Sequence, residues 1–260
     1  MATIDFNDAN NDGVGIDFLA YLADWDSSFN PGYYGFFSDN PSDFVGNQFA
    51  VADSNSATVA GVGSADTVVL DSGIADDLYY DMTSHVLAGA VDGATFGQGL
   101  SYNSGTDTFS QSSWDIDING LGLTGTGPAN AVHNFVYGIM QGDPTNLLSA
   151  LNSQNNTFNG SSGSDVLYSF DGNDTLTGGG GADLFVFQGS DGNDVITDFN
   201  AAQDFIDITP WAAGSALSVS YAYDAVSGLY DATITDGVNG SISVQDIANS
   251  SLVLGVNLFA

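Results

Sequence analysis

Apolar residues recur with helical spacing in three segments of the first 152 residues. Residues 15–25 are predicted to form an amphipathic helix, because apolar side chains recur at every third position between Asp and Ala (Ile16, Leu19, Leu22 and Trp25). A second helix is predicted from about Ala129 to Gln141, since Pro128 precedes it and Gly142 follows it. A third helix is predicted to begin after Asp143-Pro144 and to run through about Leu151.

Short apolar or alternating runs predict strands around these helices. In the first region the expected strands are 48–52, 57–62, 67–70, 78–82, 86–91 and 114–118. Near the end of the chain they are 217–223, 229–235 and 241–244. Strands bracketed by helices predict an α+β fold for the N-terminal region.

Four nine-residue units follow one another between residues 160 and 197, with a two-residue slip before the last. Each unit has Gly at its fourth position, Asp at its sixth and an apolar residue at its eighth. The glycines are Gly163, Gly172, Gly181 and Gly192, and the aspartates are Asp165, Asp174, Asp183 and Asp194.

This pattern has a direct chemical interpretation. Gly lets the backbone turn so that several carbonyl groups face a common point, and Asp supplies the hard anionic oxygen that Ca²⁺ prefers. The apolar residue fills the narrow interior between two small sheets. We therefore expect these glycines and aspartates to bind Ca²⁺. The alternative is that they form ordinary Gly-Asp loops without metal, but four copies of the same pattern disfavour it.

Charge narrows the possible functions. The chain has no Lys or Arg, and its 32 acidic residues, all Asp, give a formal net charge of −32 at pH 7. Without cationic side chains it is not expected to bind nucleic acid or anionic lipid. Apolar residues make up 43% of the chain, too many for a disordered acidic tail. We expect bound divalent cations to reduce the repulsion among the carboxylates.

Targeting signals and cysteine content bear on the compartment. The N-terminus lacks the basic and apolar regions of a Sec signal peptide, and no apolar run approaches the about 18 residues of a membrane-spanning helix. No membrane insertion is therefore expected. The absence of Cys excludes disulfides and thiolate metal sites.

The nine-residue units resemble the G-G-x-G-x-D-x-U-x repeats of RTX-type β-rolls. The resemblance implies that each Ca²⁺ lies between loops about eighteen residues apart, which pairs Asp165 with Asp183 and Asp174 with Asp194. The apolar tail LVLGVNLFA resembles the C-terminal signal of type I secretion substrates, although it could equally be a last strand that closes a sheet. Together these features imply a secreted, extracellular protein exported by a type I secretion apparatus.

From residue 4 to about 152 the chain resembles the HasA-type haem-acquisition proteins, or hemophores. Three ordered blocks carry the resemblance: residues 4–25, residues 78–93 and residues 131–143, the last of which reads AVHNFVYGIMQGD. The resemblance implies a curved antiparallel sheet packed with helices for residues 1–155. An RTX parallel β-roll and a C-terminal β segment with the secretion region are expected for residues 156–260.

In the hemophore family, a tyrosine assisted by a neighbouring histidine holds ferric haem, usually with a second histidine on a separate loop. The resemblance places Tyr80 at the axial tyrosine, with Tyr79 as the alternative, and His85 at the assisting histidine. A histidine that accepts the phenol proton favours phenolate, which suits Fe(III).

The loop that carries the second histidine in the family differs here. Residues 27–48 contain no His, and Tyr33 and Tyr34 are among the aromatic residues in that segment. These two side chains could stack on a porphyrin or could be ordinary core and surface aromatics. His133 is expected to be a structural residue of the second helix.

These features predict a secreted hemophore-like protein that captures haem, free or from a haem-carrying protein, for a TonB-dependent outer-membrane receptor. The alternative is an extracellular calcium-binding structural or adhesion protein that uses the same fold without haem. An enzyme is not expected, because His85 and His133 cannot form an H-E-x-x-H motif and no G-x-S-x-G motif is present.

Overall fold

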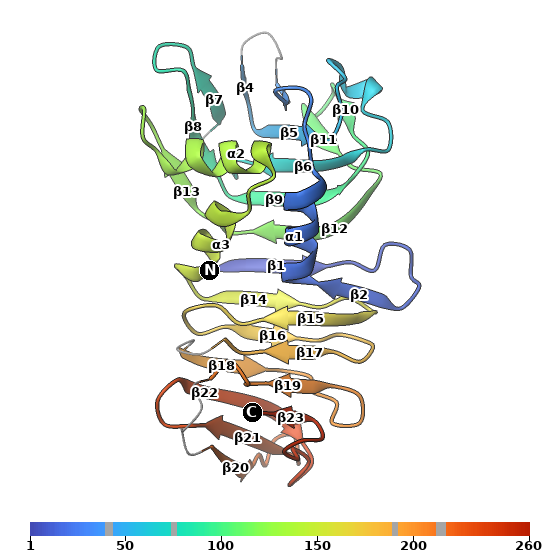
Figure 1. Cartoon of the computed structure of the whole chain (residues 1–260), viewed down its shortest axis with the longest axis vertical. Helices are drawn as coiled ribbons and strands as arrows, with labels where there is room; N and C mark the ends of the chain where they lie inside the picture. The colour runs from blue at the N-terminus through green and yellow to red at the C-terminus, as the bar shows by residue number, and fades with distance from the viewer. Residues whose placement is uncertain (40–43, 74–76, 189–191, 212–216) are drawn as a thin grey trace. The chain divides into compact units, whose positions relative to one another are not determined.

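The computed structural model describes residues 1–39, 44–73, 77–188, 192–211 and 217–260 (Figure 1). The chain forms two compact units. Unit 1 contains Met1–Ala20 and Leu151–Ala260, and unit 2 contains Tyr21–Ala150. Strands dominate the described residues, and the α-helices among them are α1 (Phe18–Ser28), α2 (Ala131–Gln141) and α3 (Thr145–Asn152). No helix in these described ranges has the length and apolar character needed to span a bilayer.

Unit 1 contains two sheets, drawn mainly in yellow to red in Figure 1. One has the order β20 (Ser218–Tyr223), β21 (Tyr230–Thr235), β22 (Gly240–Ile247), β18 (Gly192–Ile196), β16 (Thr175–Thr177), β14 (Asn156–Asn159) and β1 (Ala2–Phe6). The other has the order β2 (Val14–Asp17), β15 (Ser164–Tyr168), β17 (Leu184–Val186), β19 (Phe205–Asp207) and β23 (Leu258–Phe259).

The repeats alternate between these two sheets. β15 pairs with β17, and β16 pairs with β18, both in parallel register. The apolar eighth position of each repeat is fully buried (Leu167, Leu176, Phe185 and Ile196). The nine-residue period therefore places one apolar side chain in the core of unit 1 at each step.

The first 20 residues lie in unit 1 with the repeats, whereas the boundary predicted from the sequence lies between residues 155 and 156. β1 pairs in parallel with β14, and β2 pairs in parallel with β15. The helix expected from residue 15 begins at Phe18 instead, and Val14–Asp17 form a strand. Here pairing with residues about 150 positions away overrides the helical spacing of the local sequence.

Unit 2 is built on antiparallel strands, as expected for the N-terminal region. Its larger sheet has the order β12 (Ser113–Asn119), β9 (Gly93–Gln98), β6 (Asp66–Asp71), β5 (Gln48–Ala52) and β3 (Phe36–Phe37). A second sheet has the order β13 (Leu123–Gly125), β8 (Val86–Val91), β7 (Leu78–Asp81) and β4 (Val45–Gly46). The strand predicted at residues 57–62 is wrong, because Val59–Gly61 form a 3₁₀-helix.

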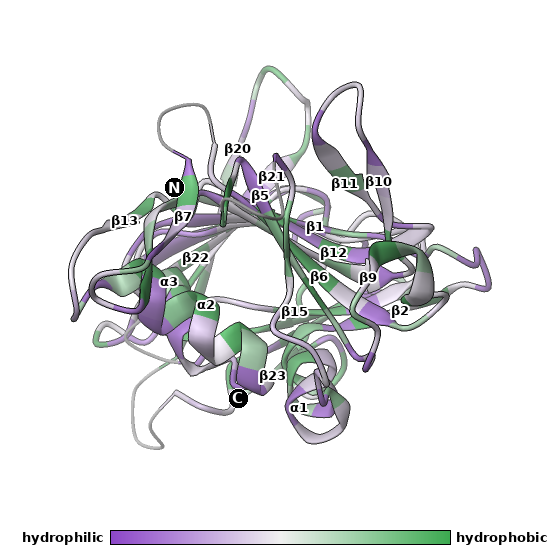
Figure 2. Ribbon diagram, turned by 90° about the horizontal axis from the view of Figure 1, so that it is seen from above, coloured by the Kyte–Doolittle hydropathy of each residue, from purple (hydrophilic) through white to green (hydrophobic). Residues whose placement is uncertain are grey.

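Helix α2 packs on β8, the strand that follows His85, and on β13. Its N-cap is Asn130, whose side chain accepts the backbone N–H of His133, and it ends at Gly142 in the left-handed conformation (φ 76°). One face is buried (Val132, Phe135, Val136 and Ile139), and the helix carries both apolar and polar turns in Figure 2.

Candidate functional site

Three aspartates form a ladder on the β15–β17–β19 side of unit 1. The backbone N–H of Asp165 donates to Oδ1 of Asp183 (2.9 Å), and that of Asp183 donates to Oδ1 of Asp204 (3.0 Å). The other carboxylate oxygens accept N–H groups of their own loops, from Ser161 to Asp165 (2.6 Å) and from Asn200 to Asp204 (2.7 Å). All three aspartates are at most 4% exposed.

A second ladder follows β14, β16 and β18. The N–H of Asp174 donates to Oδ1 of Asp194 (2.8 Å). The N–H of Asn156 donates to Oδ1 of Asp174 (2.6 Å), and the N–H of Phe170 donates to its Oδ2 (2.7 Å). The structure therefore brings together both predicted pairs, Asp165 with Asp183 and Asp174 with Asp194.

The predicted glycines hold these loops close together. Gly172, Gly181 and Gly192 have φ values of 114°, 106° and 99°, which residues with a Cβ rarely adopt. A Cβ on Gly192 would collide with the carbonyl oxygen of Gly172, and one on Gly181 would collide with that of Gly163. Only Gly allows these carbonyl-bearing loops to stack.

Burial of the ladder carboxylates is electrostatically unfavourable without a cation. Burial, together with the charges of Asp204, Asp165 and Asp198, raises the pKa of Asp183 to about 7, against the lowering effect of the Asp165 N–H. Burial also raises the pKa values of Asp165 and Asp204. A bound cation would relieve this penalty at neutral pH.

Calcium fits this donor set. It takes six to eight oxygen ligands from carboxylates, backbone carbonyls and water. Across the described residues, no three His, Cys, Asp or Glu side chains converge as a metal-binding group, so backbone carbonyls would have to complete each site. The stacked Gly loops, in which a Cβ would meet a neighbouring carbonyl, provide such oxygens.

In unit 2, Tyr80 and His85 meet at the tip of the β7–β8 hairpin. The Tyr80 hydroxyl lies 3.2 Å from Nδ1 of His85. His85 has a φ of 59°, and its N–H donates to the carbonyl oxygen of Asp81 (2.8 Å). The Asp81 carboxylate closes the turn by accepting the Ser84 hydroxyl (2.6 Å) and the Thr83 N–H (2.8 Å), which lower its pKa.

This pair can transfer a proton. Nδ1 accepts the phenol hydrogen when the other imidazole nitrogen carries the ring hydrogen. The Tyr80 ring also packs near Phe44, with 6.1 Å between ring centroids. The turn that holds His85 thus keeps a proton acceptor beside a partly exposed phenol.

Tyr79, the alternative ligand, faces elsewhere. Successive strand residues point to opposite faces of a sheet, and Tyr79 lines a cavity of about 540 Å³. The cavity is also lined by Val45, Asp77, Gly89, Thr124, Gly125 and Thr126. The structure therefore places Tyr79 and Tyr80 in different environments, and only Tyr80 contacts His85 among the interactions described.

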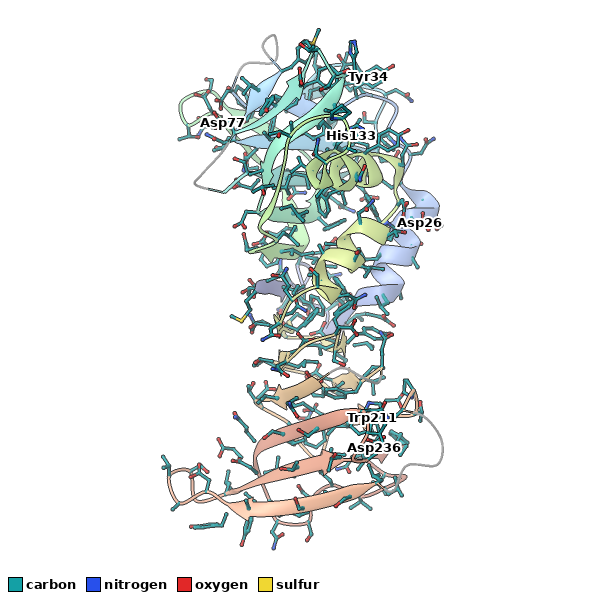
Figure 3. The ribbon with its side chains drawn as sticks, turned by 90° about the vertical axis from the view of Figure 1, so that its left-hand side faces the viewer. Asp26, Tyr34, Asp77, His133, Trp211 and Asp236 are labelled. Atoms are coloured by element: carbon teal, nitrogen blue, oxygen red, sulfur yellow. The ribbon has the colours of Figure 1, made fainter. Side chains whose placement is uncertain are left out.

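Tyr33 and Tyr34 belong to the segment before β3. Tyr33 stacks on Phe36 (5.5 Å between ring centroids) and lies 6.2 Å from Tyr34. Tyr34 is 83% exposed and lies near the end of unit 2 drawn at the top of Figure 3. These contacts describe a surface aromatic group, and a contact of either ring with haem stays a prediction.

His133 connects α2 to the candidate hairpin. The Leu87 N–H donates to Nδ1 of His133 (3.3 Å), and Asn130 Nδ2 donates to the Leu87 carbonyl (3.1 Å). Figure 3 labels His133 on α2. This contact supports the structural role expected for His133.

Sequence reasoning missed two members of the ladders. Asn156 takes the place of the aspartate one unit before the first repeat, and Phe158 takes the apolar place, so a nine-residue register counted backwards could have found them. Asp204 lies 21 residues after Asp183, outside the nine-residue register, but Asp204 and Ile206 repeat the Asp-to-apolar spacing of the units, which was the signal that could have found it.

Comparison with protein families identifies the repeat region. Residues 152–185 match the RTX calcium-binding nonapeptide repeat family, whose model spans four copies. The match begins before the first unit recognised from the sequence and therefore includes Asn156. The expected RTX repeats are confirmed.

Comparison with curated proteins identifies the other region. The chain is 29% identical over 150 residues to "Hemophore HasA" of Serratia marcescens, which covers 51% of this chain and 71% of that protein. The expected similarity to the hemophores is confirmed, at low identity.

Similar solved structures include the apo hemophore HasA of Yersinia pestis (24% identity, 59% of this chain, 87% of that chain, TM-score 0.46). The holo form of the same hemophore gives 24% identity over 59% of this chain and 89% of that chain, with a TM-score of 0.47. The AlgE6R3 subunit of the Azotobacter vinelandii mannuronan C5-epimerase gives 20% identity, 41% of this chain, 73% of that chain and a TM-score of 0.26.

Proposed function

We propose that this chain, which joins a region similar to hemophore HasA to RTX calcium-binding repeats, is a secreted haem-binding protein. It captures extracellular haem, free or from a haem-carrying protein, for a TonB-dependent outer-membrane receptor. A type I secretion apparatus exports it, and its RTX region folds when calcium binds.

The observation that carries the haem proposal is the 3.2 Å contact between the Tyr80 hydroxyl and Nδ1 of His85. Phenolate is a known protein ligand of ferric haem. Haem bound here would supply a Fe(III) centre, and Tyr80 would hold it. His85 would take the phenol proton and thereby favour the charged form of Tyr80.

Calcium has a separate role in unit 1. Asp165, Asp174, Asp183 and Asp194, with the carbonyls of the Gly163, Gly172, Gly181 and Gly192 loops, would hold the ions. Because calcium binds the folded loops and not the unfolded chain, it shifts the equilibrium towards the folded roll by mass action.

Hemin titration of the purified protein in millimolar calcium tests the haem proposal. We expect a saturable spectrum with a phenolate-to-iron charge-transfer band. Because residues 27–48 contain no His, the chain would hold the iron mainly through Tyr80, and the spectrum should be that of a site with one strong protein ligand. Tyr80→Phe should abolish the band, and His85→Ala should weaken binding more as pH falls.

Two variants serve as controls. Tyr137→Phe removes a hydroxyl from an exposed tyrosine of α2 and should leave the band intact. Tyr79→Phe tests the alternative ligand. Loss of the band in Tyr79→Phe and its retention in Tyr80→Phe would move the site to Tyr79. No saturable hemin spectrum from the wild type would contradict the haem proposal altogether.

The chain's charge favours a second candidate function. With no Lys or Arg, the protein offers haem propionates no cationic side chain, and its net charge of −32 repels them. If hemin does not bind, an extracellular calcium-binding structural or adhesion protein is the better assignment. Circular dichroism across a calcium titration should then still show folding at about 10⁻⁴–10⁻³ M.

A further inference from the structure

The N-terminal segment (residues 2–17) forms the first rung of both sheets of the roll. In β1, Ala2 and Ile4 lie opposite Asn156 and Phe158 of β14. In β2, Val14 lies opposite Ser164 of β15. More than 130 residues separate each of these strands from its partner in the sequence.

The N-terminal segment is bonded to a candidate calcium ligand. The N–H of Ile16 donates to Oδ1 of Asp165 (2.5 Å). In the same way, the N–H of Asp165 donates to Oδ1 of Asp183, and the N–H of Asp183 donates to Oδ1 of Asp204. The N–H of Ser164 also donates to the carbonyl of Gly13 (3.2 Å). Ile16 therefore occupies the ladder position that precedes Asp165, without a carboxylate of its own.

The N-terminal segment and the start of α1 also close the apolar interior of the roll. Phe6 stacks on Phe18 (5.8 Å between centroids), and Phe18 contacts Phe158 (5.7 Å) and Phe170 (6.1 Å) edge to face. All four rings are at most 6% exposed. Without the segment, the first rung of the repeats would expose apolar side chains to water, which disfavours the folded roll.

We propose that residues 2–17 are a calcium-dependent clasp, which docks on the roll only when calcium orders the loop from Gly160 to Asp165. Asp165 links the two events, because the same buried carboxylate is a candidate calcium ligand and the acceptor for Ile16. Residues 2–17 thus bind the roll of their own chain. The proposal rests on calcium binding by the repeats.

Hydrogen–deuterium exchange of the full chain tests this clasp, read separately for peptides covering residues 2–17 and residues 164–186. At a calcium concentration 100 times the Kd, both peptides should exchange about 100-fold more slowly than in chelator. If only residues 164–186 respond, the calcium proposal stands and the clasp is wrong. If neither responds, calcium binding by the roll itself fails.

Two glycine variants give the matched comparison. In Gly15→Ala, the new Cβ would collide with Oδ1 of Asp165 and with the Ser164 backbone, so β2 cannot dock as it does in the wild type. Residues 2–17 should then exchange at the chelator rate even in calcium. Gly105→Ala adds a methyl group in a turn of unit 2, where the nearest atom is Oδ1 of Asn103 at 3.3 Å, and should leave the protection intact. Equal protection of residues 2–17 in both variants would overturn the clasp.

Discussion

Asp183 should make the calcium-free roll less stable as pH rises. Its side chain is 2% exposed, and burial raises its pKa from 3.8 to about 7. A raised pKa means that the folded state binds the proton more tightly than the unfolded state. The resulting stabilisation is complete below about pH 4 and is lost as pH rises through about 7.

The size of this effect follows from the shift. At about 1.4 kcal/mol per pH unit, a rise of about 3 units corresponds to about 4 kcal/mol. Because the effective dielectric constant inside proteins is about 20, we take about half of this, about 2 kcal/mol. That is about a 30-fold change in the folding equilibrium constant. Burial raises the pKa values of Asp165 and Asp204 too, which adds in the same direction.

Far-UV circular dichroism in chelator between pH 8 and pH 5 measures this change and stays above the pI of about 4.1. The wild type should gain roll structure as pH falls. Asp183→Asn should hold more structure at pH 8 and should show a flatter pH dependence, by about 10-fold in the equilibrium constant, because the range from pH 8 to pH 5 covers about two thirds of the interval over which the effect develops. In calcium, Asp183→Asn should instead weaken binding, because the ion requires the charged carboxylate.

Asp171→Asn is the matched control, because Asp171 is an exposed carboxylate of the same repeats. It lowers the net negative charge by the same amount without touching the ladder. If Asp171→Asn flattens the pH dependence as much as Asp183→Asn does, general charge repulsion explains the effect. The reasoning about the buried carboxylate would then be wrong.

Two further predictions concern packing in unit 1. Gly192→Ala should lower the free energy of unfolding in calcium, measured by urea unfolding, by at least about 1–3 kcal/mol, because Gly192 has φ 99° and its new Cβ would collide with the Gly172 carbonyl oxygen. Gly237→Ala should lower it less, because Gly237 has φ 76° but lies in open space. Phe158→Ala should cost about 3–5 kcal/mol by the same measurement, since its side chain is fully buried, whereas Phe205→Ala, 38% exposed, should cost clearly less. Equal losses within either pair would contradict the packing argument.

The repeat region was predictable because its signal is local. A nine-residue period specifies which residues form turns, which are buried and which carry carboxylates, and each unit has the same residue types at the same positions. The pairs Asp165–Asp183 and Asp174–Asp194 followed from the RTX resemblance, and the structure brings each pair together. Helix α2 was predictable for the same reason, since its apolar spacing and its terminal Gly lie within one short segment.

The candidate haem pair was predictable only in part. The resemblance to the hemophores indicated Tyr80 and His85, but Tyr79 remained an alternative to Tyr80 as the iron ligand. The alternation of side chains along β7 directs Tyr80 to His85 and Tyr79 to a separate cavity. The left-handed backbone of His85 completes this geometry, and no residue pattern in the sequence announced it.

The repeats, the acidic charge, helices α2 and α3 and the strands β5 to β8, β12 and β20 to β22 could be predicted from the sequence, because they depend on composition and short-range spacing. That residues 14–17 form a strand, that residues 2–17 pair with the roll and that Asp204 joins the ladder became clear from the three-dimensional structure alone. Each of these depends on a backbone partner far away in the chain. The free energy of pairing with these distant partners outweighs the local propensity of the segment, and the local sequence pattern does not indicate which distant segment will pair.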